Sequence, residues 1–333
     1  MPEKFGYQEY RDNLARQIKD EPDKGKRREI LEGAKETTEY KNAESEKRDS
    51  SEITEQDFET QPKDFLEFRK NSSSSINNEI CEKFFNGNLS DEELQTYFQT
   101  DPDTTKAIKF VLESFAKPQD PSKARRKDGS HIAVHSLQLF KTGRDYLKIS
   151  DPDILKTVLV HDIIEDTKVS EQEINDQLGE RTAQLANLMT EERVHDGTTE
   201  LDKADLGRLD IVRFIKKLQS GGDVIAAAEA IDRADDISDL AYLTNKLAKN
   251  PEDKNKVKQA LIAKFGKCQY TVDQVTKGST DNTVQRLKEF FQGLVSEQLS
   301  ALRSQFGVEV TTDEIQEEWK RYDRLQDLAT NKN

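Results

Sequence analysis

The chain has 333 residues, of which 33% are hydrophobic and 35% are charged, and its formal net charge is −14. The length allows about two ordinary domains, but the low apolar fraction favours one good core with an extensive charged surface. The acidic balance argues against a general binder of nucleic acid or of anionic membranes, because both need a basic surface.

Neither end of the sequence suggests export or membrane insertion. The first residues lack the apolar segment of a secretory signal, and no window approaches the roughly 20 apolar residues that span a bilayer. The two cysteines, Cys81 and Cys268, lie far apart without a CxxC pair, so neither a disulfide framework nor a zinc ribbon is indicated. We therefore expect a cytoplasmic protein with reduced thiols.

Three regions follow one another along the chain. Residues 1–75 are rich in charged residues and end in a polar run, which predicts a partly helical or mobile N-terminal arm. Residues 76–250 contain clear helix signals and all four histidines of the chain, and they predict the main domain. Residues 251–333 predict a C-terminal helical extension, with helices over 283–303 and 311–328.

Helix starts are marked by capping boxes or by an N-terminal cap followed by proline. A further helix is predicted over 224–248, after the pair Gly221-Gly222. Alternating strand patterns are few, so the fold class is predicted to be all-α. The marked starts are Ser90 with Glu93, Asp101 with Pro102, Asp151 with Pro152, and Ser170 with Glu173.

The segment 161–167, HDIIEDT, combines a histidine with three acidic residues. In a helix, His161 and Glu165 would lie one turn apart, as would Asp162 and Asp166, so all four would project from one face. The preceding residues are apolar, so this face leads back into a core. An unpaired carboxylate there would cost several kcal/mol, about 2–7, unless a cation compensates.

Four residues from three predicted helices form a plausible ligand set for that cation. They supply two imidazoles and two carboxylates, a mixture that suits a six-coordinate divalent ion such as manganese or iron and leaves positions for water and substrate. Such an ion activates water and polarises a phosphoryl oxygen, which favours hydrolysis of a phosphate ester. The four residues are His135, His161, Asp162 and Asp232.

The order His, His-Asp, Asp resembles the HD superfamily of metal-dependent phosphohydrolases, and the closer similarity is to the (p)ppGpp hydrolase domain of the RelA/SpoT type. The resemblance covers about residues 105–250. It is carried by Arg126-Lys127-Asp128-Gly129 with His135 nine residues after the arginine, by the segment 161–167, and by residues 231–236, which are similar to the family motif Ala-Asp-Arg-x-His-Asn.

The resemblance implies an HD-type helical bundle that hydrolyses the 3′-pyrophosphate of (p)ppGpp to GDP or GTP and pyrophosphate. No motif of the family's synthetase domain follows position 250, so only hydrolysis is implied. The implied roles are Mn²⁺ or another divalent metal bound by His135, His161, Asp162 and Asp232, water and leaving-group protons handled by Glu165 and Asp166, and the guanine nucleotide held by Arg126 and Lys127, with the arginine stacked on the base.

Two acidic residues depart from the family pattern. Asp236 stands where the family has asparagine and Asp239 where it has threonine, and both family residues contact the nucleotide. We therefore expect Asp236 at the substrate, whereas Asp235 and Asp239 are expected on a solvated acidic face. The departures leave two alternatives open: a phosphohydrolase acting on another phosphorylated nucleotide, or a non-catalytic alarmone-binding regulatory protein.

Overall fold

The computed structural model divides the chain into two compact units, Met1–Gln61 and Pro62–Asn333. Apart from Lys26, the first unit lies outside the described residues, and so does most of the predicted N-terminal arm. Within the second unit the structure describes residues 62–71, 74–120, 124–126, 129–191, 201–240, 244, 247 and 250–330.

The described residues confirm the all-α prediction. The structure is 77% helical, and no strand occurs in the described ranges. Two isolated β-bridges, Pro118 with Thr167 and Arg125 with His131, tie loops together without forming a sheet.

The first half of the unit consists mainly of short helices that build one side of the site. In chain order they are α4 (Pro62–Asn71), α5 (Ser74–Phe85), α6 (Asp91–Phe98), α7 (Pro102–Phe115), α8 (Ala133–Lys141), the π-helix η3 (Thr142–Tyr146), α9 (Pro152–Val160), α10 (Ile163–Asp166), α11 (Glu171–Leu178) and α12 (Glu180–Met189).

Longer helices dominate the second half. They are α13 (Lys203–Gln219), α14 (Gly222–Ser238), the 3₁₀-helix η4 (Pro251–Asp253), α16 (Lys254–Val275), α17 (Asn282–Phe306), α18 (Thr312–Asp323) and α19 (Gln326–Thr330).

All four predicted helix starts are confirmed. At α6 the Glu93 amide donates to Ser90 Oγ at 3.2 Å and the Ser90 amide donates to the Glu93 carboxylate at 2.8 Å. Ser170 makes the same reciprocal pair with Glu173 at α11. At α7 and α9 an aspartate caps the helix and proline occupies the first turn. Each device satisfies amides that have no partner inside the helix.

Two predicted helix ends are wrong. The helix predicted over 224–248 is α14, which ends at Ser238, and the helix predicted over 311–328 is interrupted between α18 and α19. The end of α14 coincides with tertiary contacts of Asp239, whose carbonyl accepts a hydrogen bond from Lys264 Nζ at 3.2 Å. No glycine or proline marks this end in the sequence, so the local pattern could not reveal it.

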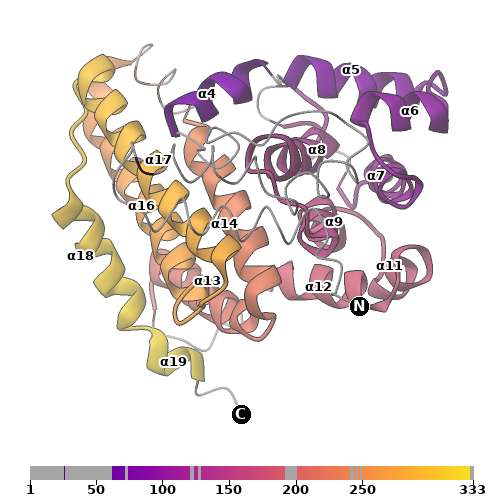
Figure 1. The fold of residues 1–333 in the computed structure, drawn as a ribbon. Coiled ribbons are helices and arrows are strands. Elements are labelled where there is room, and N and C mark those ends of the chain that lie inside the picture. The colour runs from indigo at the N-terminus through magenta and orange to yellow at the C-terminus, as the bar shows by residue number, and fades with distance from the viewer. Residues whose placement is uncertain are drawn as a thin grey trace. The chain divides into compact units, whose positions relative to one another are not determined.

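Two clusters of buried apolar side chains fill the unit. One is formed largely by α13, α14, α16 and α17, and the other largely by α7 and α8 with side chains of α5 and α6. Helices α8, α9 and α12 contribute side chains to both clusters. In Figure 1, α14 lies between α16 and α17 on one side and α8 and α9 on the other, and it contacts all four. The junction of α8, α9 and α14 is where the candidate site lies.

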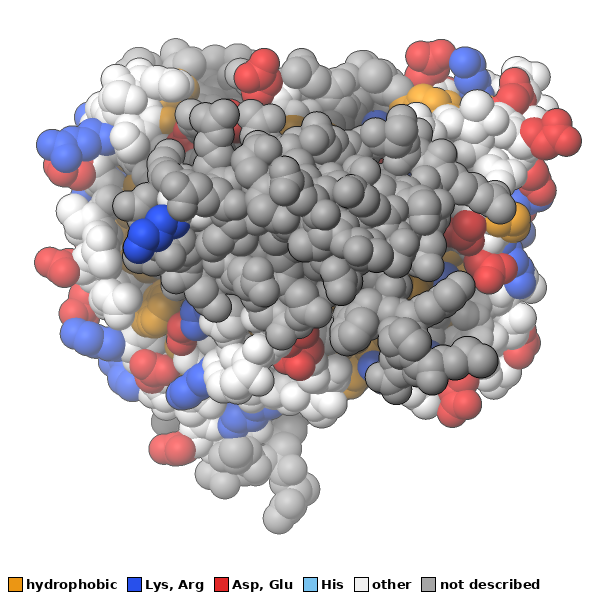
Figure 2. Space-filling model, viewed as in Figure 1, with side chains coloured by type: hydrophobic (Ala, Val, Ile, Leu, Met, Phe, Trp, Pro, Cys, Tyr) orange, Lys and Arg blue, Asp and Glu red, His pale blue; other side chains and the backbone are white. Residues whose placement is uncertain are grey.

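The surface carries charges of both signs. On the face drawn in Figure 2, acidic and basic side chains are interspersed over the described part, and apolar side chains show only in small patches. Among the described residues, Leu328 is the large apolar side chain that is exposed. No helix in the described ranges combines the length and the apolar character needed to cross a bilayer.

Candidate metal centre

Three helices position the central side chains. His135 lies in α8, and Asp232 lies in α14. The apolar helix α9 ends at Val160, so His161 and Asp162 occupy the turn that leads into α10. His161 Nδ1 lies 3.0 Å from the carbonyl oxygen of Val158. A hydrogen bond donated there leaves His161 Nε2 as the nitrogen available to a ligand.

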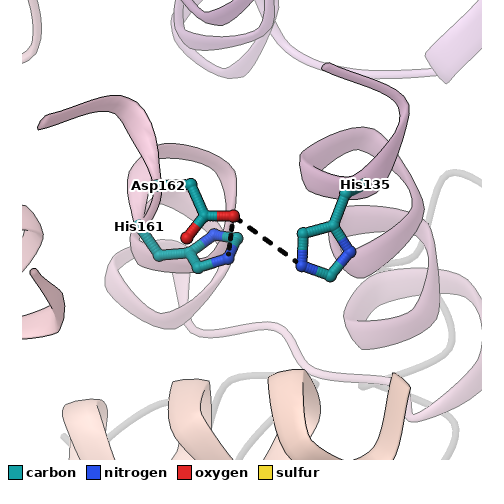
Figure 3. A group of neighbouring side chains, drawn as sticks. All are labelled: His135, His161 and Asp162. Carbon is teal, nitrogen blue, oxygen red and sulfur yellow. Dashed lines mark ion pairs between the residues drawn. The ribbon is translucent and has the colours of Figure 1, made fainter. Parts of the chain in front are cut away.

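Three of the four predicted metal ligands form one compact group, and the fourth, Asp232, lies beside the two imidazoles. His161 Nε2 is 3.0 Å from Asp162 Oδ2 and 3.8 Å from Asp232 Oδ1. His135 Nε2 is 3.2 Å from Asp232 Oδ1 and 3.9 Å from Asp162 Oδ2. Figure 3 shows the Asp162 carboxylate directed toward both imidazole rings. Ligand atoms of His135, His161 and Asp162 all fall within 4.8 Å of one another.

These spacings fit a single divalent cation. Metal–ligand bonds of about 2.1 Å place neighbouring ligand atoms about 3 Å apart and opposite ligand atoms about 4 Å apart. The four distances between an imidazole nitrogen and a carboxylate oxygen, 3.0 to 3.9 Å, fall between those limits. The donor set of two imidazole nitrogens and two carboxylate oxygens also suits a first-row divalent ion.

The electrostatics of the four residues favour a bound positive charge. Burial alone would lower the pKa of His135, but hydrogen bonding with Asp232 and Asp235 raises that pKa to about 10. Burial likewise opposes the charge of His161, whose pKa the Asp162 carboxylate raises to about 9. Burial would raise the pKa of Asp232, but the Arg233 charge and the two imidazoles hold it well below its usual range. Protons on the imidazoles thus neutralise part of the negative charge of the carboxylates. A bound cation would replace these protons and neutralise the same charge.

One prediction about the surrounding acidic residues is wrong. Asp235 was expected on a solvated face, but its side chain is 1% exposed. Its Oδ2 lies 3.3 Å from His135 Nδ1. Helical spacing alone could not separate Asp235 from the half-buried Asp239, because the difference arises from the packing of other helices against α14.

A cavity of about 200 Å³ opens beside the four residues. Six carboxylates and one guanidinium line it, together with the two histidines and two apolar side chains, so an anion could enter only with a compensating cation. The lining residues are His135, His161, Asp162, Glu165, Met189, Glu191, Phe214, Glu229, Asp232, Arg233 and Asp236.

Glu165 projects into this cavity from α10. Its Oε1 accepts a hydrogen bond from the backbone amide of Glu191. Burial raises the pKa of Glu165 to about 7, although this hydrogen bond acts in the opposite direction. A carboxyl group with this pKa exchanges protons readily near neutral pH. Glu191 follows the end of α12, and no sequence signal linked it to the cavity.

Arg233 is the guanidinium of the cavity, and acidic residues hold it on several sides. Its Nε donates to Glu229 Oε1 at 2.5 Å and its Nη1 donates to Asp236 Oδ2 at 2.8 Å. Its Nη2 lies 3.6 Å from Asp232 Oδ2. Glu229 is fully buried, which raises its pKa, and its Oε2 has no hydrogen-bond partner among the described residues. The spacing of Glu229, Asp232 and Asp236 on one helix could have placed Glu229 at the site.

The remaining predicted site residues differ in position. Asp236 lines the cavity, whereas Asp166 ends α10 and is absent from the lining. Arg126 is also absent from the lining, and its Nη2 lies 3.5 Å from Asp239 Oδ2. Lys127 falls outside the described residues.

Comparison with known proteins adds no assignment to this geometry. A scan against protein-family models and searches of curated proteins and solved structures found no significant match to the chain.

Proposed function

We propose that the chain is a divalent-cation-dependent phosphohydrolase of the HD type. The observation that carries the proposal is the grouping of ligand atoms from His135, His161 and Asp162 within 4.8 Å of one another, with the Asp232 carboxylate close to both imidazoles. His135, His161, Asp162 and Asp232 would hold Mn²⁺ or a similar ion. When bound, such an ion supplies a Lewis acid that activates water and stabilises charge on a phosphoryl oxygen.

The chain's own side chains supply the remaining functions. Glu165 has a pKa of about 7 and lines the same cavity, so we assign to it the proton of the attacking water or of the leaving group. Arg233 offsets part of the negative charge of the cavity wall. Asp166 does not line the cavity, and the proposal therefore gives it no direct contact with the reacting atoms.

The substrate that the sequence resemblance favours is (p)ppGpp, with hydrolysis of its 3′-pyrophosphate. The cavity volume of about 200 Å³ lies below the roughly 300–1,000 Å³ of pockets that enclose a drug-sized ligand. The reacting phosphates would therefore occupy the cavity while the nucleoside lies outside it.

A different phosphorylated nucleotide is the second candidate substrate. Asp236 presents a carboxylate to the cavity where the related family has an amide, and Arg126 pairs with Asp239. Carboxylates at these positions disfavour additional phosphate groups and favour hydrogen-bond donors of a base or sugar. This observation bears on the identity of the substrate and leaves the proposed metal chemistry unchanged.

A nucleotide panel tests the proposal. The full chain, loaded with Mn²⁺, is incubated with ppGpp, pppGpp and other phosphorylated nucleotides, and the release of pyrophosphate or phosphate is measured. We expect Mn²⁺-dependent turnover that Asp162→Asn abolishes and that Glu165→Gln lowers by about 100-fold or more. Asp176→Asn, on the exposed side of α11, is the matched control and should leave turnover unchanged.

The possible outcomes separate the alternatives. Turnover of another nucleotide but not of ppGpp would replace the substrate and keep the chemistry. Tight binding of ppGpp without turnover of any compound would reject the enzyme in favour of a regulatory nucleotide-binding protein.

A further inference from the structure

The second ring nitrogen of His135 faces away from the proposed cation. Its Nε2 approaches Asp232 and Asp162, whereas its Nδ1 lies 3.3 Å from Asp235 Oδ2. Asp235 follows Asp232 by three positions, so one face of α14 presents both carboxylates to the same imidazole. Nε2 therefore faces the proposed metal ligands, whereas Nδ1 faces Asp235, which is not one of them.

Asp235 is itself held by Arg69 from α4. Arg69 Nε donates to Asp235 Oδ1 at 2.8 Å, and Nη2 donates to Oδ2 at 3.2 Å. This two-point pairing fixes the plane of a carboxylate as well as its position. The side chains of Arg69 and Asp235 are 17% and 1% exposed, so little solvent competes for the pair.

Helix α4 has its own anchor next to Arg69. Phe65 is fully buried, and its ring centroid lies 5.2 Å from that of Tyr146 and 5.3 Å from that of Phe290. Phe65 and Arg69 are four positions apart and therefore lie on one face of the helix. The aromatic contacts thus bring the guanidinium to Asp235.

We propose that Asp235 and Arg69 are positioning residues for the cation site, an inference that rests on the proposed metal-dependent function. His135 Nδ1 is buried and lies 3.3 Å from Asp235 Oδ2 without a completed hydrogen bond among the described residues. With the cation bound, Asp235 would accept a hydrogen bond from this nitrogen, which would orient the ring and leave the Nε2 lone pair directed at the cation. Arg69 acts through Asp235 by holding its carboxylate in place. Metal-binding histidines commonly donate the other ring N–H to a carboxylate in this way.

Mn²⁺ affinity of the full chain tests this arrangement by titration calorimetry. Asp235→Ala should weaken Mn²⁺ binding by about 10- to 100-fold, and Asp235→Asn by less, because the amide keeps one acceptor oxygen. Arg69→Met should weaken binding in the wild-type background but cause no further loss in Asp235→Ala, since it acts through the missing carboxylate. The double variant also avoids leaving Asp235 buried without its partner.

A matched buried pair elsewhere controls for lost stability. Glu318 is 4% exposed and receives Arg208 Nε at 2.7 Å and Nη2 at 3.2 Å, which is nearly the geometry of Asp235 with Arg69. Neither Arg208 nor Glu318 lines the cavity. Glu318→Ala should therefore change Mn²⁺ affinity by less than about twofold while lowering thermal stability.

Nuclear magnetic resonance of the Zn²⁺-loaded protein gives a readout that a purely structural role would not move. We expect a protected Nδ1–H signal from His135 that disappears in Asp235→Ala and is retained in Glu318→Ala. Unchanged Mn²⁺ affinity in Asp235→Ala, additive losses for Arg69→Met, or a metal-bound Nδ1 would each overturn the inference.

The same titration distinguishes this inference from the proposed function. If the wild-type chain binds Mn²⁺ with the expected variant effects but hydrolyses no nucleotide, the positioning role stands and the hydrolase proposal fails. If the wild-type chain binds no Mn²⁺, both fail.

Discussion

Glu165 carries a carboxyl group whose charge changes near neutral pH. Its pKa lies at about 7 in the folded chain against an ordinary value of 4.5, and burial is the main cause. Between those two pH values the folded state binds more protons than the unfolded state, so the free energy of unfolding falls as pH rises. Above pH 7 this loss is complete.

Glu165→Gln should therefore stabilise the metal-free protein in a pH-dependent way. The amide stays neutral and keeps an oxygen that can accept the hydrogen bond from the Glu191 amide. The variant and the wild type should unfold at similar urea concentrations near pH 4.5, and the variant should gain stability relative to the wild type as pH rises to 7. If the difference in stability between the variant and the wild type stays constant from pH 4.5 to 7, burial does not raise the pKa of Glu165.

Arg233 offers a second test at the scale of single residues. Removing its charge in Arg233→Met leaves Glu229, which is fully buried, without its partner, and this should cost about 3–5 kcal/mol of unfolding free energy. Adding Glu229→Gln removes the unpaired charge and should restore a large part of that loss. Urea unfolding of the two single variants and of the double variant measures the coupling energy between Arg233 and Glu229. Strictly additive losses of unfolding free energy would contradict this coupling.

His135, His161, Asp162 and Asp232 could be selected from the sequence by their residue types and order, and the structure places them near one another. Their supports could not be chosen in the same way: Arg69 lies 166 positions from Asp235, and Glu191 follows a helix end without any motif. Such partners are brought together by packing, which a local pattern does not encode.

Helix α4 docks against α17, which lies far along the chain. Phe65 anchors it, and truncation to alanine should cost about 3–5 kcal/mol while releasing α4 from the rings of Tyr146 and Phe290. Amide hydrogen exchange should accelerate throughout α4 in Phe65→Ala. Phe98→Ala, in the other apolar cluster, is the control: it should cost similar stability without selectively exposing α4. Equal exchange in α4 for both variants would contradict this docking.

The starts of helices were predictable and some of their ends were not. Each cap side chain accepts a hydrogen bond from an amide in the first turn of its own helix, so both partners lie within a few residues of sequence. These caps are Ser90, Asp101, Asp151 and Ser170. The end of α14 coincides instead with a contact from a residue distant in sequence, the hydrogen bond from Lys264 to the Asp239 carbonyl. The π-helix η3 had no recognised local signal either.

At the scale of the whole molecule, the packing of α14 joins regions that the sequence separates. A domain over 76–250 followed by an extension over 251–333 was predicted because every motif lies in the first of these regions. In the structure α14 contacts α16 and α17, and the three helices fill one apolar cluster. Composition and motifs point to candidate site residues such as Asp232 on α14. They do not reveal that α16 and α17 bury the opposite, apolar face of this helix.

This packing predicts that the motif-bearing region cannot fold alone. A fragment of residues 1–250 would lack Phe265, Phe291 and Leu294, which are buried side chains of the cluster shared with α14, and would expose the apolar face of α14 to water. We expect it to unfold without a cooperative thermal transition and to bind Mn²⁺ at least 10-fold more weakly than the full chain. Residues 62–333 should retain both properties, since they form one compact unit. Circular dichroism melting and Mn²⁺ titration of the two fragments measure this difference. Cooperative unfolding of 1–250 with full-chain Mn²⁺ affinity would show instead that α14 holds Asp232 in place without the C-terminal helices.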